Sequence, residues 1–214
     1  MESRAIVRIA LLAAVIAALG MVPSIVLPIA MGVPITAQTL GVMLAGIVLG
    51  PRHGALAVLL FLFVVLLGAP LLSGGRGGLG VLFGPSVGFL LGWAPAAFVS
   101  GLVMARLRTL PVFAAALVAA IAGGIVVEYT CGILGLMAMA RMSLPQALAA
   151  TAVFVPGDLL KALATAFVAE ASHRSYPAAI VSRSRPWPPP SPQCCRGMPA
   201  KRRADRLSFA RTMW

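Results

Sequence analysis

Long apolar runs fill this chain from near its start to about residue 171, and few charged residues interrupt them. Hydrophobic residues make up 60% of the 214 residues, charged residues make up only 10%, and the mean hydropathy is +1.00. A soluble domain carries about a quarter charged residues. A chain with so few polar side chains cannot cover its own exterior with them, so lipid must be its solvent. The sequence therefore predicts an all-α integral membrane protein.

We predict six transmembrane helices, because most of the apolar runs approach the roughly 20 residues that cross a bilayer as helix. The first run contains Pro23 and Pro28 but no small-residue cleavage pattern, which favours a retained helix over a signal peptide. The second run is short and follows a Pro-containing loop, so we expect it to line a cavity inside the protein. The predicted spans are Val7 to Ile29, Gln38 to Leu49, Ala55 to Leu72, Pro85 to Met104, Val112 to Met139 and Ala147 to Ala171.

Basic residues favour one orientation of these spans. With the N-terminus in the cytoplasm, only Arg76 and Arg141 lie outside the cell. This asymmetry follows the positive-inside rule, and an even number of spans places both termini in the cytoplasm. We therefore expect a multi-pass protein of the cell inner (plasma) membrane. The basic residues then placed inside are Arg4, Arg8, Arg52, Arg106, Arg108, Arg174 and those of the C-terminal segment.

The composition changes abruptly near Ser182, which divides the chain into a transmembrane domain (1–175) and a basic, Pro-rich tail (182–214). We expect this tail to be disordered and cytoplasmic. Weak attachment to anionic lipid and no function at all are both compatible with its composition. Eight of the 17 Lys and Arg residues lie after Val181, so most of the net charge of +12 belongs to the tail. Because the rest of the chain has no basic face, we expect no nucleic-acid partner.

Metal and disulfide chemistry are not indicated. Cys194 and Cys195 are adjacent, Cys131 lies in an apolar run, and the two histidines are far apart in the sequence. This spacing fits neither a disulfide framework nor a metal site. We expect no metal and no cofactor.

Two ionisable residues, Asp158 and Lys161, lie within the last predicted span. They are three residues apart, so they share a helix face, and Pro156 and Gly157 before them allow the backbone to deviate. Charges inside a bilayer are costly and usually face an interior cavity where they bind something. We therefore predict a substrate-binding pair; a structural ion pair between helices is the alternative.

Glu128 is an acidic residue within the fifth predicted span, and we expect it to be buried. It could line the same pocket, or pair with Lys161 or Arg76. Arg76 itself lies in a glycine-rich external loop that includes Gly75 and Gly77. Such a loop can approach a ligand closely and present a guanidinium to a carboxylate. A flexible external linker without a binding role is the alternative.

Two further patterns complete the candidate residues. Thr36 and Gln38 offer hydrogen-bonding groups near the outer surface, although Thr36 could instead cap the following helix. Ala10, Ala14 and Ala18 repeat at four-residue spacing, and small residues at this spacing permit close approach of another helix. That helix could belong to this chain or to a separate partner subunit.

Three segments, taken in order, resemble the BioY family, the biotin-binding S components of energy-coupling-factor (ECF) transporters. They are VPITAQTLGVMLAGIVLGP, LGAPLLSGGRGGLGVLFGPSVGFLLG and FVPGDLLKALATAFVAE, from about Val33 to Ala169. The resemblance implies six helices, a biotin pocket near the outer face, and charged residues of the GDLLK motif, Asp158 and Lys161, at the ligand. It also implies that the alanine-rich first helix docks on a transmembrane coupling subunit, which works with ATPase subunits.

The expected function is therefore biotin binding and uptake, with biotin as the transported ligand and no enzyme activity. Asp158 could accept the ureido N–H groups, Lys161 could donate to the ureido carbonyl, and Arg76 suits the carboxylate. The alternatives are an S component for another vitamin, an intramembrane enzyme using Asp158 or Glu128, and a structural membrane subunit. The sequence does not decide whether the chain works alone, self-associates or requires an ATPase module.

Overall fold

The computed structural model describes residues 3–22, 25–26, 33–175 and 180. The chain divides into two units, residues 1–183 and 184–214, and the second lies outside the described residues. The predicted tail after Ser182 therefore stays a prediction.

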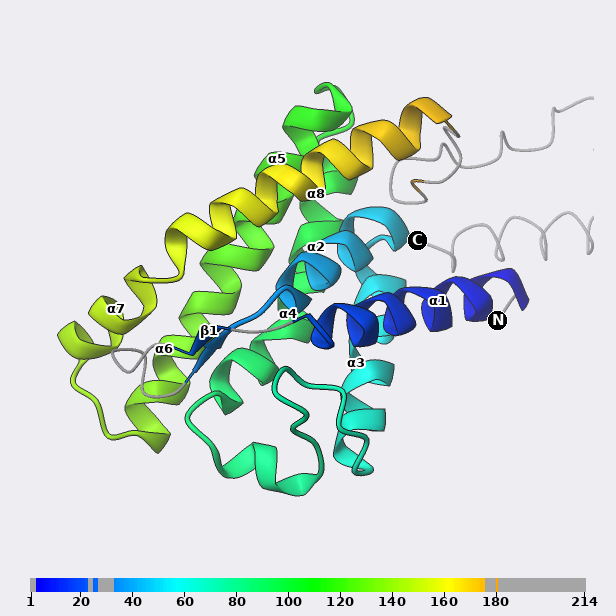
Figure 1. Ribbon diagram of the computed structural model, residues 1–214. Helices are drawn as coiled ribbons and strands as arrows, with labels where there is room; N and C mark the ends of the chain where they lie inside the picture. The colour runs from blue at the N-terminus through cyan, green and yellow to red at the C-terminus, as the bar shows by residue number, and fades with distance from the viewer. Residues whose placement is uncertain (1–2, 23–24, 27–32, 176–179, 181–214) are drawn as a thin grey trace, which may run out of the picture. The chain divides into compact units, whose positions relative to one another are not determined.

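The described part of the chain is helical apart from one pair of two-residue strands, so the all-α class is confirmed (Figure 1). A π-helical turn, η3, joins α5 to α6, and η2 is a short 3-10 helix. The elements are α1 (Ser3–Gly20), β1 (Ile25–Val26), β2 (Pro34–Ile35), α2 (Gln38–Leu49), α3 (Pro51–Leu66), η2 (Leu79–Phe83), α4 (Val87–Arg106), α5 (Val112–Ile121), η3 (Ala122–Val127), α6 (Glu128–Met139), α7 (Leu144–Ala152) and α8 (Val155–Ser175).

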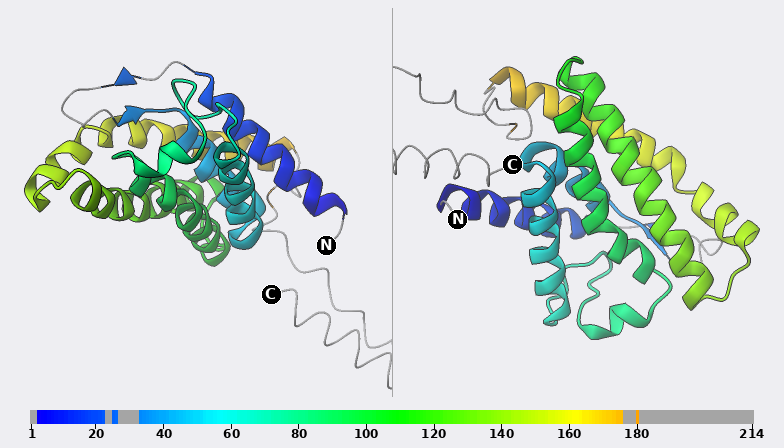
Figure 2. Two further views of the ribbon diagram at one scale, coloured as in Figure 1. Left: turned by 90° about the horizontal axis from the view of Figure 1, so that it is seen from below. Right: turned by 180° about the vertical axis from the view of Figure 1, so that it is seen from behind.

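Fewer helices are long enough to cross a bilayer than the six spans that we predicted. Three described helical stretches are long and apolar enough to cross a bilayer: α1, α4 and the continuous stretch Val112–Met139. The last of these has the predicted bounds, and Figure 2 shows α5, η3 and α6 continuing into one another. The helices α7 and α8 would form a fourth span, but they bend by 50° at their junction. Both α2 and α3 are shorter, with 12 and 16 residues.

Three predicted spans were wrong in extent. The third, expected from Ala55 to Leu72, corresponds to α3, which begins at Pro51 and ends at Leu66. The first was expected to reach Ile29, but α1 ends at Gly20, and Ile25–Val26 pairs with Pro34–Ile35 as antiparallel strands. The last was expected to run unbroken from Ala147 to Ala171, but it breaks between α7 and α8. Proline explains the break, because Pro156 has no N–H to donate and its ring would clash with the carbonyl four residues earlier.

The short helix α2 lies inside the protein, as we expected for a run too short to face lipid. Ten of its 12 residues are buried, and it contacts α1, α3, α4, α5 and α8. At about 1.5 Å per residue it is only about 18 Å long, less than the hydrocarbon thickness of a bilayer. The N-terminal end of α2, with Gln38 and Thr39, therefore lies in the interior of the bundle.

The helix α4 organises the rest of the bundle through contacts with α2, α3, α5, η3 and α6. Glycines allow two of these helices to approach closely. A methyl group on Gly88 of α4 would lie 2.7 Å from the Cα of Gly135 on α6. Large apolar side chains point outward instead, among them Phe63 of α3 and Phe167 of α8, which are 60% and 63% exposed. An apolar exterior of this kind is suited to lipid.

Candidate ligand-binding site

A cavity of about 540 Å³, counted with its open mouth, lies where α2, α4, α6 and α8 meet two loops. Its wall combines apolar and aromatic side chains with four ionisable ones. The lining residues are Val33, Pro34, Thr36, Gln38, Thr39, Leu72, Arg76, Ser86, Phe89, Leu90, Trp93, Glu128, Tyr129, Phe154, Asp158 and Lys161.

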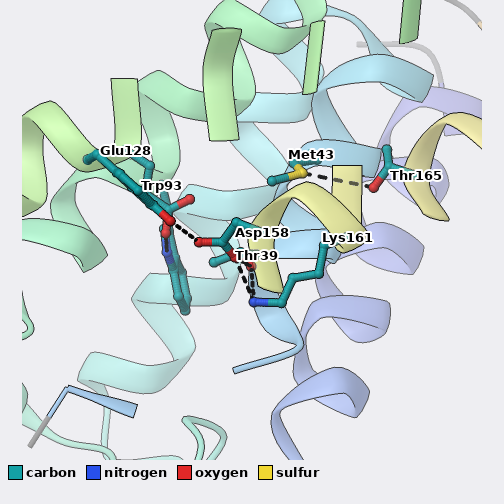
Figure 3. Close-up of polar contacts among 8 residues, drawn as sticks. Thr39, Met43, Trp93, Glu128, Asp158, Lys161 and Thr165 are labelled. Carbon is teal, nitrogen blue, oxygen red and sulfur yellow. Dashed lines mark hydrogen bonds and ion pairs between the residues drawn. The ribbon is translucent and has the colours of Figure 1, made fainter. Parts of the chain in front are cut away.

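Asp158 is the centre of a hydrogen-bonded cluster in this cavity, drawn in Figure 3. Its Oδ1 lies 2.7 Å from Lys161 Nζ and accepts a longer bond of 3.5 Å from the Thr39 hydroxyl. Lys161 also donates to Thr39 Oγ1 at 3.1 Å. On the other oxygen, Oδ2 accepts a hydrogen bond of 2.6 Å from the Tyr129 hydroxyl. The prediction that Asp158 and Lys161 share one helix face is confirmed.

The bend before α8 places Asp158 in the first turn of that helix. Pro156 and Gly157 precede it, and its backbone N–H donates to the Phe154 carbonyl at 2.9 Å. The positive end of the helix dipole favours a carboxylate in a first turn. Asp158 is only 5% exposed, although Leu160, two residues on, is 68% exposed. The helix therefore turns its ion pair inward and its leucines outward.

The π-helical turn η3 directly precedes the second buried carboxyl group, that of Glu128. A π turn inserts an extra residue and so changes the direction in which the following side chains point. Glu128 accepts a hydrogen bond of 3.0 Å from Trp93 Nε1 of α4. Among the described residues the two ion pairs are Lys161–Asp158 and Arg174–Glu170. Glu128 therefore lines the cavity and pairs with neither Lys161 nor Arg76.

The loop between α3 and η2 presents Arg76 at the mouth of the cavity. Leu72 and Arg76 form an isolated antiparallel bridge around a turn at Gly74 and Gly75. These two glycines have φ values of +79° and +69°, in a region that other residues rarely adopt. Arg76 donates to the Ser73 carbonyl at 3.3 Å and to Ser86 Oγ at 3.4 Å. The loop is thus a defined turn that joins Arg76 to the start of α4.

Gly75 and Gly77 themselves do not line the cavity. Gly75 occupies the left-handed turn position, with open space where a side chain would be. A methyl group on Gly77 would instead collide with the carbonyl of Ala69. The structure therefore gives both glycines a role in shaping the loop that carries Arg76.

Gln38 and Thr36 both line the cavity, but Gln38 has several partners within the protein. Its amide nitrogen donates to the carbonyls of Leu71, at 3.1 Å, and Ile16, at 3.4 Å, and its Oε1 accepts from Ser73 N. It thereby joins α1 and the Arg76 loop to α2. The alternative of Thr36 as a helix cap is wrong, because Ala37 occupies the N-cap of α2 and no side chain caps it.

The three alanines Ala10, Ala14 and Ala18 are all exposed on α1. The face of α1 that packs against α2 and α3 carries instead Ile9, Ala13 and Ile16. The alanine stripe therefore does not pack against another described helix of this chain, which was one of the two alternatives. The stripe is free to contact another protein or lipid.

Sequence reasoning did not select several lining residues, including Thr39, Trp93 and Tyr129. Tyr129 directly follows Glu128, and Thr39 directly follows Gln38, so adjacency to a polar residue was the available signal. Trp93 lies in an apolar run without such a signal, and only the packing of α4 against the η3 turn brings it to Glu128. In the described part of the chain, no group of three or more His, Cys, Asp or Glu residues could hold a metal ion.

The fold and the cavity together define a helical membrane protein with a charged site among its helices. The sequence pattern of the BioY family matches residues 1–178, and the chain belongs to this family. It is 50% identical over 189 residues to the biotin transporter BioY of Rhodobacter capsulatus, with 84% of this chain and 98% of that protein covered. It is 45% identical to the biotin transporter BioY of Rhizobium etli, covering 83% and 97% of the two chains.

A solved structure with a similar fold supports the same family. The chain is similar to the S-component for biotin from an ECF-type ABC transporter, whose crystal structure was determined at 2.1 Å. The TM-score is 0.74 and the sequence identity is 30%, with 81% of this chain and 92% of that chain covered. The family resemblance read from the three sequence segments is thus confirmed.

Proposed function

We propose that this chain is the biotin-binding subunit, or S component, of an ECF-type vitamin transporter, and that it is not an enzyme. The names of its relatives and of its structural neighbour support this function. The observation that links this function to a site is the Asp158–Lys161 ion pair, which lines the cavity. Both residues belong to the GDLLK segment on which the resemblance rests.

The bicyclic end of biotin suits this pair. Its ureido ring offers two N–H donors flanking a carbonyl acceptor. Asp158 accepts an N–H, and the neighbouring Lys161 ammonium donates to the carbonyl. Hydrogen bonds to charged groups contribute about 1.5–3 kcal/mol each, more than those between neutral groups. Lys161 is already held by Thr39 and Asp158, so little ordering remains to be done when the ligand binds.

The other end of biotin, its carboxylate, fits Arg76 at the mouth of the cavity. Two of the five guanidinium N–H donors are engaged by Ser73 and Ser86, which orients the group and leaves others for an anion. Phe89, Leu72 and Phe154 supply apolar wall between the two polar ends, which suits the thiophane ring and the aliphatic chain.

We further propose six spans with both termini in the cytoplasm of the inner membrane. This topology requires α2 and α3 to count as spans although each is short, and α7 with α8 to count as one. The distribution of arginines supports it. The cavity, bounded by the Arg76 loop, then opens toward the outer face, where a transported vitamin arrives.

The partner surface that we propose is the exposed alanine stripe on α1. Small residues allow a helix of a transmembrane coupling subunit to approach closely, and ATPase subunits then drive transport. Self-association of this chain through the same face is the second candidate for this surface.

The proposal is tested by calorimetric titration of the purified protein with biotin. We expect saturable binding of one biotin per chain, without competition from other water-soluble vitamins. Displacement of biotin by another vitamin at lower concentration would indicate a sister S component. No binding of any vitamin would favour a structural subunit, and turnover of a bound compound would favour an enzyme.

A further inference from the structure

One carboxylate oxygen of Glu128 is buried and accepts no hydrogen bond from the described residues. The side chain is 3% exposed and lines the same cavity as Asp158. Its Oε1 accepts from Trp93, but Oε2 has no hydrogen-bond partner among the residues that the structure describes. A buried polar atom without a hydrogen-bond partner is energetically unfavourable, so it marks a position where a ligand can supply one.

Asp158, by contrast, already accepts hydrogen bonds from three side chains and can accept few more. A carboxylate has about four lone-pair positions for hydrogen bonds. Lys161 and Thr39 both approach Oδ1, and Tyr129 approaches Oδ2. One position therefore remains for a ligand N–H, whereas a cyclic urea presents two N–H groups on opposite sides of its carbonyl.

We propose that Glu128 is the second acceptor of the site: its Oε2 accepts one ureido N–H while Asp158 accepts the other. This inference rests on the proposed function, because it assumes a cyclic urea in the cavity. Glu128 lies on α6 and Asp158 on α8, so two different helices present the two carboxyl groups to the same cavity. In Figure 3 Glu128 lies beside Trp93, while Thr39 and Lys161 gather at Asp158.

Trp93 is a positioning residue in this arrangement. Its indole N–H holds Oε1, which leaves Oε2 for the ligand. The ring is itself fixed by packing against Phe61, with ring centroids 6.1 Å apart. Replacement by phenylalanine keeps a smaller aromatic ring at this position and removes the indole N–H.

The test uses biotin and two cyclic carbamate analogues, in each of which one of the two ureido N–H groups is replaced by oxygen. Binding of each compound is measured by calorimetry to the purified wild-type chain, Glu128→Gln, Trp93→Phe and Asp158→Asn. Glu128→Gln preserves the shape of the side chain. It can keep an oxygen toward Trp93 only by turning an N–H toward the ligand, so we expect biotin affinity to fall on the order of tenfold.

The assignment of Glu128 is decided by which variant weakens which carbamate. We expect one carbamate to lose no affinity in Glu128→Gln but still to be weakened by Asp158→Asn, and the other to show the opposite pattern. Trp93→Phe should follow Glu128→Gln with a smaller effect. A general structural defect would instead weaken all three compounds by the same factor, which would overturn the assignment of Glu128, as would unchanged biotin affinity in Glu128→Gln. If the wild-type chain binds no biotin, the proposed function itself fails.

Discussion

The Tyr129 hydroxyl donates a hydrogen bond of 2.6 Å to Asp158 Oδ2, although 29 residues separate the two. It joins α6 to α8 inside the cavity and fixes the orientation of the carboxylate from the side opposite Lys161. A carboxylate oriented before the ligand arrives loses less freedom on binding.

Tyr129→Phe removes this hydrogen bond and little else. We expect the thermal unfolding midpoint of the ligand-free protein to fall, because a bond to a charged group contributes about 1.5–3 kcal/mol. Biotin affinity should fall by about fivefold, or roughly 1 kcal/mol, as Asp158 becomes less ordered. Thermal denaturation in detergent and calorimetric titration measure the two effects. Tighter binding by the variant would mean that Tyr129 competes with the ligand for Asp158.

Asp158→Asn should weaken biotin binding by at least about 2 kcal/mol, or nearly thirtyfold, because the amide presents an N–H to a ligand N–H. Arg76→Ala should cost about 1 kcal/mol or less, since Arg76 is exposed and ion pairs there are screened.

Biotin amide, which lacks the carboxylate, is the control for both variants. It should still depend on Asp158 but lose its sensitivity to Arg76→Ala. Equal binding of the amide to wild type and Asp158→Asn would refute the ureido assignment. Continued sensitivity to Arg76→Ala would assign Arg76 to the loop and not to the carboxylate.

Ala14→Leu should leave biotin binding intact and weaken co-purification with the proposed coupling subunit, together with biotin uptake. Ala14 is exposed, so the larger side chain meets no atom of the described bundle that must move. Ala13→Leu, one residue earlier, is the matched control, because Ala13 is buried at 8% exposure. It should destabilise the protein itself through overpacking. Unchanged co-purification in Ala14→Leu would remove the alanine stripe from the partner surface.

Gly88→Ala should lower the thermal unfolding midpoint, because its new methyl group would lie 2.7 Å from the Cα of Gly135. Backbone on both sides of the α4–α6 contact would have to move, and overpacking of this kind costs about 1–3 kcal/mol. Gly80→Ala is the control, since nothing lies within 4 Å of its added methyl group. Equal midpoints for the two variants would contradict the close approach of α4 and α6.

Single cysteines in a chain without its native cysteines test the topology. A cysteine at Gly80 or Ser143 should react with an impermeant maleimide in intact cells, and one at Thr109 only after permeabilisation. All three positions are exposed, whereas the neighbouring loop residue Ser73 is 2% exposed and would label poorly. Labelling of Thr109 in intact cells would invert the proposed orientation.

The sequence by itself determined the membrane class, the family and the pairing of Asp158 with Lys161. Apolar composition excludes water as the solvent of the bundle whatever its arrangement, and residues three apart share a face on any α-helix. The burial of α2 was also predictable, because 12 residues are too few to cross a bilayer.

Only the tertiary structure decided what surrounds that pair. The partners Thr39 and Tyr129 lie 119 and 29 residues from Asp158, and no local pattern specifies contacts over such distances. The outward direction of the alanine stripe and the use of Gly75 and Gly77 for the turn likewise depend on packing. Helical periodicity fixes which side chains share a face, but the neighbours of that face are set by how the helices pack.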